Sequence, residues 1–145
     1  MEAKKKKHNV LIEGPVQPSF IADSIAKHSS KTDIGAHAIF LGQVRADAKE
    51  AKAVKAIEYT AYPEMAENIL SDIREDLFSR YPITCMHIYH SIGTVKAGEI
   101  SLFVFVSCKH RKESFDALRD IVELLKAKVP VWKKEIYEDE SHVWV

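Results

Sequence analysis

Apolar residues recur along this chain with two different spacings, and each spacing predicts a different kind of element. Segments with strand-like apolar runs or alternation lie at about 10–13, 35–45, 57–62, 83–90, 100–108 and 132–137. Segments with helical spacing lie at about 19–27, from 63 to the Tyr81-Pro82 break, and at 113–127. Because helices and strand pairs are mixed along the chain, we expect an α+β fold: a mixed, mostly antiparallel sheet packed with three helices.

Three local features refine this prediction. Gly35–Arg45 is apolar on both faces, which predicts an interior strand. The strands at 83–90 and 100–108 are joined by the turn-forming segment Gly93–Gly98, which favours an antiparallel hairpin. Ser19 is expected to be the N-cap of the first helix.

The remaining segments predict a loop and two helical stripes. Residues 46–54 are small and charged with no apolar face, which indicates a mobile loop. The second helix should bury an apolar stripe of Met65, Ile69, Ile73 and Leu77. The third should bury Phe115, Leu118, Val122 and Leu125.

Length and composition are typical of one globular domain. The chain has 145 residues, 46% hydrophobic and 29% charged, and no apolar run approaches the roughly 20 residues needed to span a membrane. We expect a flexible basic tail at 1–9, which contains Lys4–Lys7, and one domain at 10–145. No signal-peptide core follows the lysines, so a cytoplasmic location is expected.

Cysteine usage gives no sign of a disulfide or a metal site. The two cysteines, Cys85 and Cys108, each lie in a strand-like apolar run, where a thiol usually behaves as a small hydrophobic group. Neither has the spacing of a zinc motif, so we expect no metal and no cofactor. Three histidines receive no role. His37 is expected to be a core residue, and His87 and His90 should point to opposite faces of a strand.

Positive charge is concentrated near the third helix, although the formal net charge of the whole chain is zero. Residues 109–134 hold eight basic and four acidic side chains, a local charge of +4. Helical spacing places Lys126 at the rim of the apolar stripe, where partial desolvation lowers the pKa of a lysine and suits it to catalysis. The alternative is an ordinary lysine whose stem lies along the helix edge.

Two further groups are candidates for binding an anion. Arg45 ends a strand directly before the charged loop, where a guanidinium can bind phosphate or carboxylate through two hydrogen bonds. His110 and Arg111 begin the third helix, where backbone amides also favour an anion. The alternatives are a solvated strand end and helix capping.

Four motifs resemble the large subunit of molybdopterin synthase, the MoaE family. They are FLGQVR at 40–45, EYTAYPEMAE at 58–67, SCKHRKESF at 107–115 and LKAKVPVWKKE at 125–135. The resemblance implies an α/β-hammerhead fold and sulfur transfer in molybdenum cofactor biosynthesis. The implied substrate is cyclic pyranopterin monophosphate, which gains a dithiolene. The implied sulfur donor is the C-terminal thiocarboxylate of a small ubiquitin-like subunit, bound to a homodimer to form a heterotetramer.

The resemblance also assigns residues. It implies catalytic roles for Lys126 and Lys133, and substrate binding by Arg45, His110 and Arg111. It places Phe40 in the channel that receives the tail of the small subunit. The sequence departs from many relatives at Ala46-Asp47, where they continue with asparagines, and it ends just after Trp144, where they often carry a further basic segment.

Two alternative functions fit parts of the sequence. One is a non-catalytic module of the same fold that docks a ubiquitin-like partner. The other is RNA binding through the lysine-rich tail and the third helix, which zero net charge and the lack of an aromatic stacking motif oppose.

Overall fold

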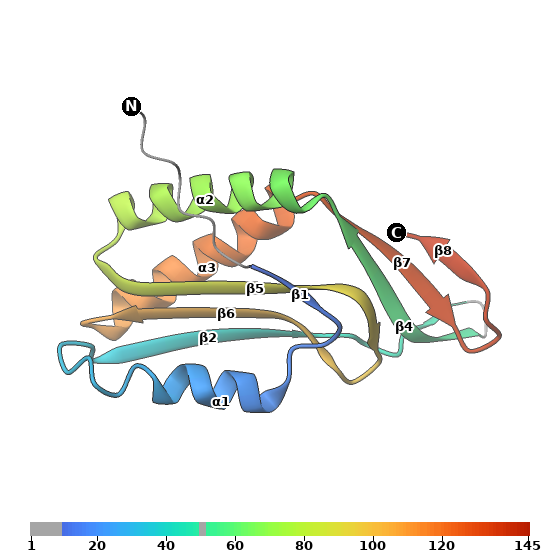
Figure 1. Ribbon diagram of the computed structural model, residues 1–145, viewed down its shortest axis with the longest axis horizontal. Coiled ribbons are helices and arrows are strands. Elements are labelled where there is room, and N and C mark those ends of the chain that lie inside the picture. Colours follow the sequence, from blue (N-terminus) through green and yellow to red (C-terminus); the bar gives the residue numbers. More distant parts are fainter. Residues whose placement is uncertain (1–9, 50–51) are drawn as a thin grey trace.

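A computed structural model describes residues 10–49 and 52–145, which form eight strands and three helices (Figure 1). In chain order the elements are β1 (Leu11–Glu13), α1 (Pro18–Ala26), β2 (Ala36–Gln43), β3 (Ala48–Lys49), β4 (Lys52–Ala61), α2 (Pro63–Arg80), β5 (Ile83–Lys96), β6 (Ile100–Cys108), α3 (Arg111–Lys128), β7 (Val131–Tyr137) and β8 (His142–Trp144). The predicted α+β class with three helices is confirmed. The tail expected at 1–9 lies outside the described residues.

The strands form one sheet in the order β2-β6-β5-β4-β7-β8, with β1 added beside β5 and β3 beside β4. Every ladder is antiparallel except the parallel β1–β5 pair, so the predicted mostly antiparallel sheet is confirmed. The first part of β5 pairs with β6, and its last residues, from Gly93 to Lys96, pair with β4. Gly93 has φ +84°, a conformation that favours glycine, at this change of partner. The predicted hairpin exists, but its turn lies at 97–99 because β5 continues through Gly93.

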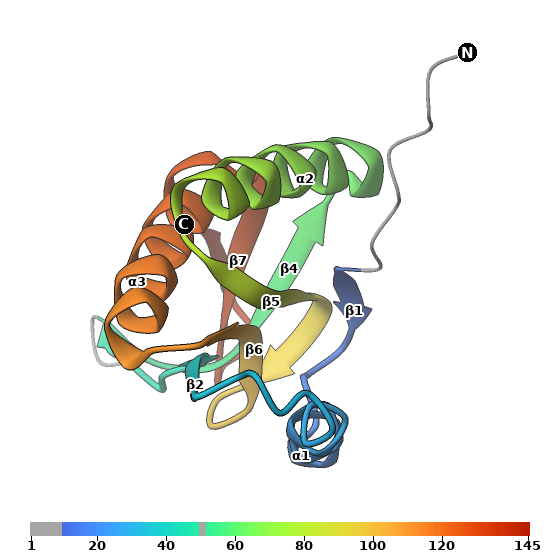
Figure 2. The ribbon, with the colours of Figure 1, turned by 90° about the vertical axis from the view of Figure 1, so that its left-hand side faces the viewer.

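Helices cover both faces of the central strands, as Figure 2 shows: α2 and α3 lie on one side and α1 on the other. The apolar run in β6 serves both layers because successive side chains alternate between the two faces. Leu102, Val104 and Val106 are buried in the core that also contains residues of α2 and α3. Phe103 and Phe105 are buried against residues of α1.

The prediction that β2 is an interior strand was wrong. β2 pairs with β6 alone among the described strands and lies at the edge of the sheet. Its two apolar faces arise from the helix layers: Ile39 packs with the α1 side and Phe40 with the α2 and α3 side.

Two smaller predictions also need correction. The N-cap of α1 is Gln17, not Ser19, and it makes no side-chain capping bond because Pro18 already fixes the first helical turn. The segment expected as a loop at 46–54 contains β3, and β4 begins at Lys52.

The predicted stripes of α2 and α3 are rotated relative to the buried ones. Met65 and Phe115 are 49% and 59% exposed, whereas the buried residues are Ala66, Leu70, Ile73 and Leu77 in α2, and Ser114, Ala117, Ile121 and Leu125 in α3. At the start of α3 the residues that face the core are Ser114 and Ala117, and Phe115 between them points outward. Among the described residues, no helix is both long and apolar enough to cross a bilayer.

Candidate active site

A cavity of about 510 Å³ lies where the end of β2, the start of β6, the strands β4 and β7, and the last turn of α3 meet. Of the residues proposed from sequence, Arg45, Lys126 and Lys133 line it. We call it the basic cavity. Its other lining residues are Gly42, Gln43, Val44, Asp47, Ile57, Tyr59, His90, Ser101, Leu102, Glu135 and Val145.

Strand register determines which side chains of β7 face the basic cavity. Lys133 lies opposite Tyr59 in the β4–β7 ladder, and Glu135 follows two residues later on the same face. Lys134 points to the opposite face, where its Nζ lies 3.6 Å from Glu58 Oε2 and 5.2 Å from the centre of the Trp144 ring. Only one of the two adjacent lysines therefore contributes to the cavity.

Lys126 lies in the last turn of α3, where the carbonyl ends of the helix favour positive charge. Its side chain is exposed at the cavity, in agreement with the predicted position at the rim of the buried face. Lys133 is only half-buried, but its pKa is lowered, first by desolvation and then by the charge of Lys126. Lys133 is therefore a lysine of this cavity with a lowered pKa, which the sequence did not single out for that property.

His90 is a cavity residue that the sequence did not identify. Its Nδ1 lies 2.7 Å from the backbone oxygen of Ser91, and because a carbonyl can only accept, Nδ1 carries the hydrogen and Nε2 is left as an acceptor. Burial lowers the pKa of His90, and Lys133 and Lys126 lower it further, against the opposing effect of the Ser91 bond. The ring therefore lies in the basic cavity as a neutral group at pH 7.

Tyr59 and Glu135 were also not predicted as site residues. The Tyr59 hydroxyl donates to Ser101 Oγ at 3.0 Å, and burial raises its pKa despite that bond. Glu135 is buried at 7% exposure. Both residues could in part have been identified from the sequence, because Tyr59 lies in the motif at 58–67 and Glu135 is two residues after Lys133.

Arg45 reaches the cavity from the end of β2 with 81% of its side chain exposed. Its Nη2 lies 3.2 Å from Asp47 Oδ2, so the acidic residue at this departure from the family pattern is its ion-pair partner. An exposed pair of this kind contributes about 1 kcal/mol at most, so an anionic ligand can displace the Asp47 carboxylate.

A second, smaller cavity of about 220 Å³ adjoins the basic cavity and shares four lining residues with it: His90, Leu102, Lys126 and Lys133. We call it the apolar cavity because its remaining wall is aliphatic, formed by Leu70, Ile88, Leu125, Val129 and Val131. The lysines thus lie between an open polar space and a narrow apolar one.

The structure does not bring all the predicted residues together. His110 and Arg111 are exposed at the start of α3, fifteen residues before Lys126, which corresponds to about 22 Å along a helix. Phe40 lines neither cavity and packs against the core that contains Leu102. Within one chain, the candidate site therefore contains three of the six residues proposed from sequence.

Comparisons with known proteins identify the family of the chain. The sequence profile of the MoaE protein family matches residues 15–128. The chain is 42% identical over 125 residues to the molybdopterin synthase catalytic subunit of Pyrococcus abyssi, covering 86% of this chain and 82% of that protein. It is also 42% identical over 110 residues to the human protein of the same name, covering 76% of this chain and 57% of the human one.

Solved structures show the same fold. Molybdopterin synthase from Staphylococcus aureus superposes with a TM-score of 0.83 at 31% identity, covering 97% of this chain and 98% of that one. The complex of subunits 1 and 2 of molybdopterin-converting factor from Helicobacter pylori contains a chain with a TM-score of 0.80 at 17% identity, covering 93% and 88%. The second likeness concerns the fold alone.

Proposed function

The chain belongs to the MoaE protein family, and on this premise we propose that it is the catalytic subunit of a molybdopterin synthase, acting in molybdenum cofactor biosynthesis. The observation that carries the proposal is the meeting of Arg45, Lys126 and Lys133, from three separate segments, at one cavity. The reaction is the transfer of sulfur to cyclic pyranopterin monophosphate from the thiocarboxylate of a small ubiquitin-like subunit.

The charges of the cavity suit that reaction. A phosphorylated pterin and a thiocarboxylate are both anions, and fixed cations offset the repulsion between them. Arg45 is suited to the phosphate because its guanidinium is exposed and its present partner is weakly held. Lys126 is placed to stabilise negative charge as sulfur adds to the pterin side chain.

Lys133 gives the site a proton-transfer group. Its pKa is lowered by desolvation and by Lys126, so it exchanges a proton more readily near neutral pH than an ordinary lysine. The neutral ring of His90 adds an acceptor beside it. We assign Lys126 as the catalytic cation and Lys133 as its electrostatic and proton-transfer partner.

The apolar cavity is the proposed end of the path for the tail of the small subunit. It is narrow and lined by aliphatic side chains, and it opens at Lys126 and Lys133. A glycine-rich tail fits such a narrow space because it carries no side chains that would clash with the cavity walls. Its terminal thiocarboxylate would meet the two lysines where the apolar and basic cavities join.

His110 and Arg111 can serve the site only from another molecule. They lie at the far end of α3 from Lys126, so a single chain cannot use both ends at one substrate. A homodimer that places the start of one α3 beside the basic cavity of its partner would complete the set. This is the role we propose for dimerisation, and with a small subunit on each protomer the assembly is a heterotetramer.

The test is reconstitution of the full chain with a thiocarboxylated small subunit and the cyclic pterin. Wild type should form dithiolene, and Lys126→Ala should lose nearly all activity with an unchanged circular dichroism spectrum. Lys128→Ala is the matched control, because Lys128 lies in the same last turn but faces a hollow formed with α2. Full activity in Lys126→Ala would contradict the catalytic assignment of Lys126. A wild type that binds the small subunit but forms no dithiolene would instead favour the non-catalytic docking module.

A further inference from the structure

A second cluster of reactive side chains lies on the face of the sheet that α1 covers. It consists of His28, just after α1, and of Cys85 and His87 on β5. One ligand atom from each residue lies within 4.8 Å of the other two. Cys85 and His87 share this face because they are two residues apart on a strand, whereas His90 points to the opposite face and lines the basic cavity.

His28 is oriented as metal-binding imidazoles usually are. Its Nδ1 lies 2.6 Å from the backbone oxygen of Ser24, so Nδ1 carries the hydrogen and the lone pair is on Nε2. A bond of this kind from Nδ1 to a carbonyl is the common way in which proteins fix the ring of a metal ligand. His87 Nε2 donates to His28 Nε2 at 3.1 Å, and a metal ion would take the place of the hydrogen between them.

We propose that His28, Cys85 and His87 bind a divalent transition metal of the zinc class. Two imidazole nitrogens and one sulfur are the ligands that such borderline-soft ions prefer over carboxylates. His28 and Cys85 are each 7% exposed, so two of the three ligands are already desolvated and held by the fold. The site lies apart from the basic cavity and is independent of the proposed sulfur transfer.

The spacing needs only a small adjustment to accept the ion. Ligands about 2.05 Å (nitrogen) and 2.3 Å (sulfur) from a tetrahedral zinc are separated by about 3.3 Å between nitrogens and about 3.6 Å between nitrogen and sulfur. The observed nitrogen pair at 3.1 Å is close to the first value. The separations involving sulfur, which are at most 4.8 Å, would have to contract by about 1.2 Å at most.

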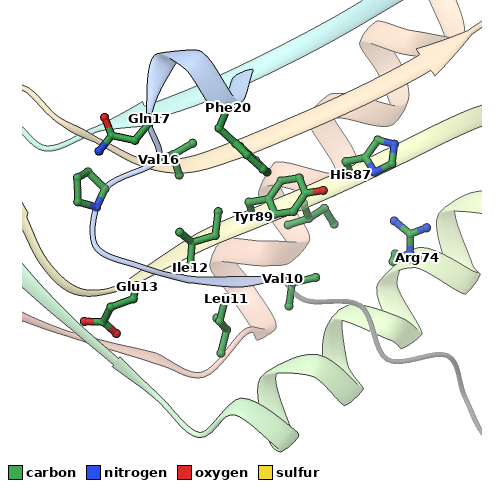
Figure 3. A pocket seen from close by; sticks show the side chains of 12 residues that line it. Val10, Leu11, Ile12, Glu13, Val16, Gln17, Phe20, Arg74, His87 and Tyr89 are labelled. Atoms are coloured by element: carbon green, nitrogen blue, oxygen red, sulfur yellow. The ribbon is translucent and has the colours of Figure 1, made fainter. Parts of the chain in front are cut away.

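The fourth coordination position has access to solvent. His87 lies on the wall of a cavity of about 730 Å³ that runs between β1, the start of α1 and β5. Figure 3 shows His87 next to Tyr89 at the end of this cavity opposite Glu13, with Arg74 reaching in from α2. A water molecule or a small anion can therefore complete the tetrahedron from the cavity side.

Two cations border the cluster. Lys31 Nζ donates to Cys85 Sγ at 2.9 Å, and Arg74 Nη1 donates to the backbone oxygen of Met86. Lys31 is exposed and flexible enough to leave, while Arg74 is held by its own bond. Metal binding releases one proton, because the thiol loses its hydrogen to solvent as the sulfur–metal bond forms. The hydrogen on His87 Nε2 moves to Nδ1 of the same ring, so both histidines bind as neutral rings.

No pattern in the sequence indicated this site, and no metal was expected there. Cys85 and His87 alone form no zinc motif, and His28 is more than fifty residues away in the chain. Only the packing of the segment after α1 on β5 brings the third ligand to the other two.

Cobalt is the probe that tests the proposal, because a sulfur–cobalt bond gives a near-ultraviolet charge-transfer band. Titration of the metal-free full chain with Co²⁺ should give that band at one equivalent per chain, and Zn²⁺ should displace it. Cys85→Ser should abolish the band, and His28→Gln should weaken Co²⁺ binding by more than about tenfold. Zn²⁺ should also raise the Tm of wild type but not of His28→Gln.

Matched controls separate this site from other thiols and histidines. Cys108→Ser removes the other buried thiol and His37→Gln removes a neighbouring ring outside the ligand set, and both should keep the band. Lys126→Ala should also keep it, so failure of the proposed sulfur transfer would leave this result unaffected. A wild type without the band, or a band lost in Cys108→Ser and kept in Cys85→Ser, would overturn the proposal.

Discussion

Lys126 and Lys133 reach the same cavity from α3 and β7, and after desolvation the charge of Lys126 is the next cause that lowers the pKa of Lys133. Two lysines that share a cavity in this way are electrostatically coupled, so a change at one alters protonation at the other. The two ammonium groups repel each other even without a ligand, and an anion bound between them would offset that repulsion.

Replacing Lys126 with methionine should therefore raise the pKa of Lys133, because one of the two effects that lower it is removed. NMR titration of the lysine side chains would measure the change. Lys134→Met is the control, since Lys134 points to the opposite face of β7 toward Glu58. An unchanged Lys133 titration in Lys126→Met would mean that the two groups do not interact.

Asp47 should compete with substrate for Arg45. Because the pair is exposed, with side chains 81% and 44% accessible, its loss is worth about 1 kcal/mol at most, or about fivefold in affinity. Asp47→Asn should thus lower the KM for the phosphorylated pterin by up to that factor and leave kcat nearly unchanged. Asp76→Asn is the control, because Asp76 forms an ion pair of the same length, 3.2 Å, with Arg80 on α2. A raised KM in Asp47→Asn would show that Asp47 helps binding.

The order and type of most elements could be predicted from sequence, but their neighbours in space could not. The apolar run at 100–108 correctly predicted a strand, and in the structure its alternate residues meet two helix layers. The argument from two apolar faces failed to place β2, because two-sided burial does not distinguish an edge strand under two layers from a central one. Strand order depends on long-range pairing, which periodicity does not encode.

Charged residues of the candidate site could be proposed from the sequence, but residues whose place in the site depends on the orientation of their strand or helix could not. Lys126, Lys133 and Arg45 were found from their charge and position and from the family motifs, and they line one cavity. His90 was missed because its face depends on how β5 lies between β6 and β4. Arg111 was expected at the same site, but the length of α3 separates it from Lys126 in one chain.

The rotated stripe of α2 gives a direct test of packing. Leu77 is fully buried whereas Met65 is 49% exposed, although both fit the apolar spacing. Leu77→Ala should lower the free energy of unfolding by about 2–5 kcal/mol through lost burial and a cavity, and Met65→Ala should change it by about 0.5 kcal/mol or less. Urea denaturation measures both. Equal losses would mean that the buried face of α2 is misassigned.

Stability should fall in mildly acidic solution because of His90. Burial holds its pKa below the ordinary value of 6.5, so the unfolded chain binds a proton more readily than the folded one. The free energy of unfolding should therefore decrease as the pH falls from about 6.5 toward the lower folded-state pKa, and it should be unaffected by this group above that window. His90→Gln should flatten this part of the profile, and replacing the exposed His142 should not. An unchanged slope in His90→Gln would assign the acid sensitivity to other groups.

Complementation between two inactive variants tests whether each site is built from two protomers. Lys126→Ala removes a group at the end of α3, and Arg111→Ala removes one at its start. If each site uses Lys126 of one protomer and Arg111 of its partner, a mixed dimer has one site with neither residue and one with both. Random mixing in equal amounts makes half of the dimers mixed, so roughly one quarter of wild-type activity should return after subunit exchange. If both residues served the same site from one chain, no mixed dimer would contain an intact site. Activity that stays near zero after demonstrated exchange would therefore contradict a site shared between two protomers.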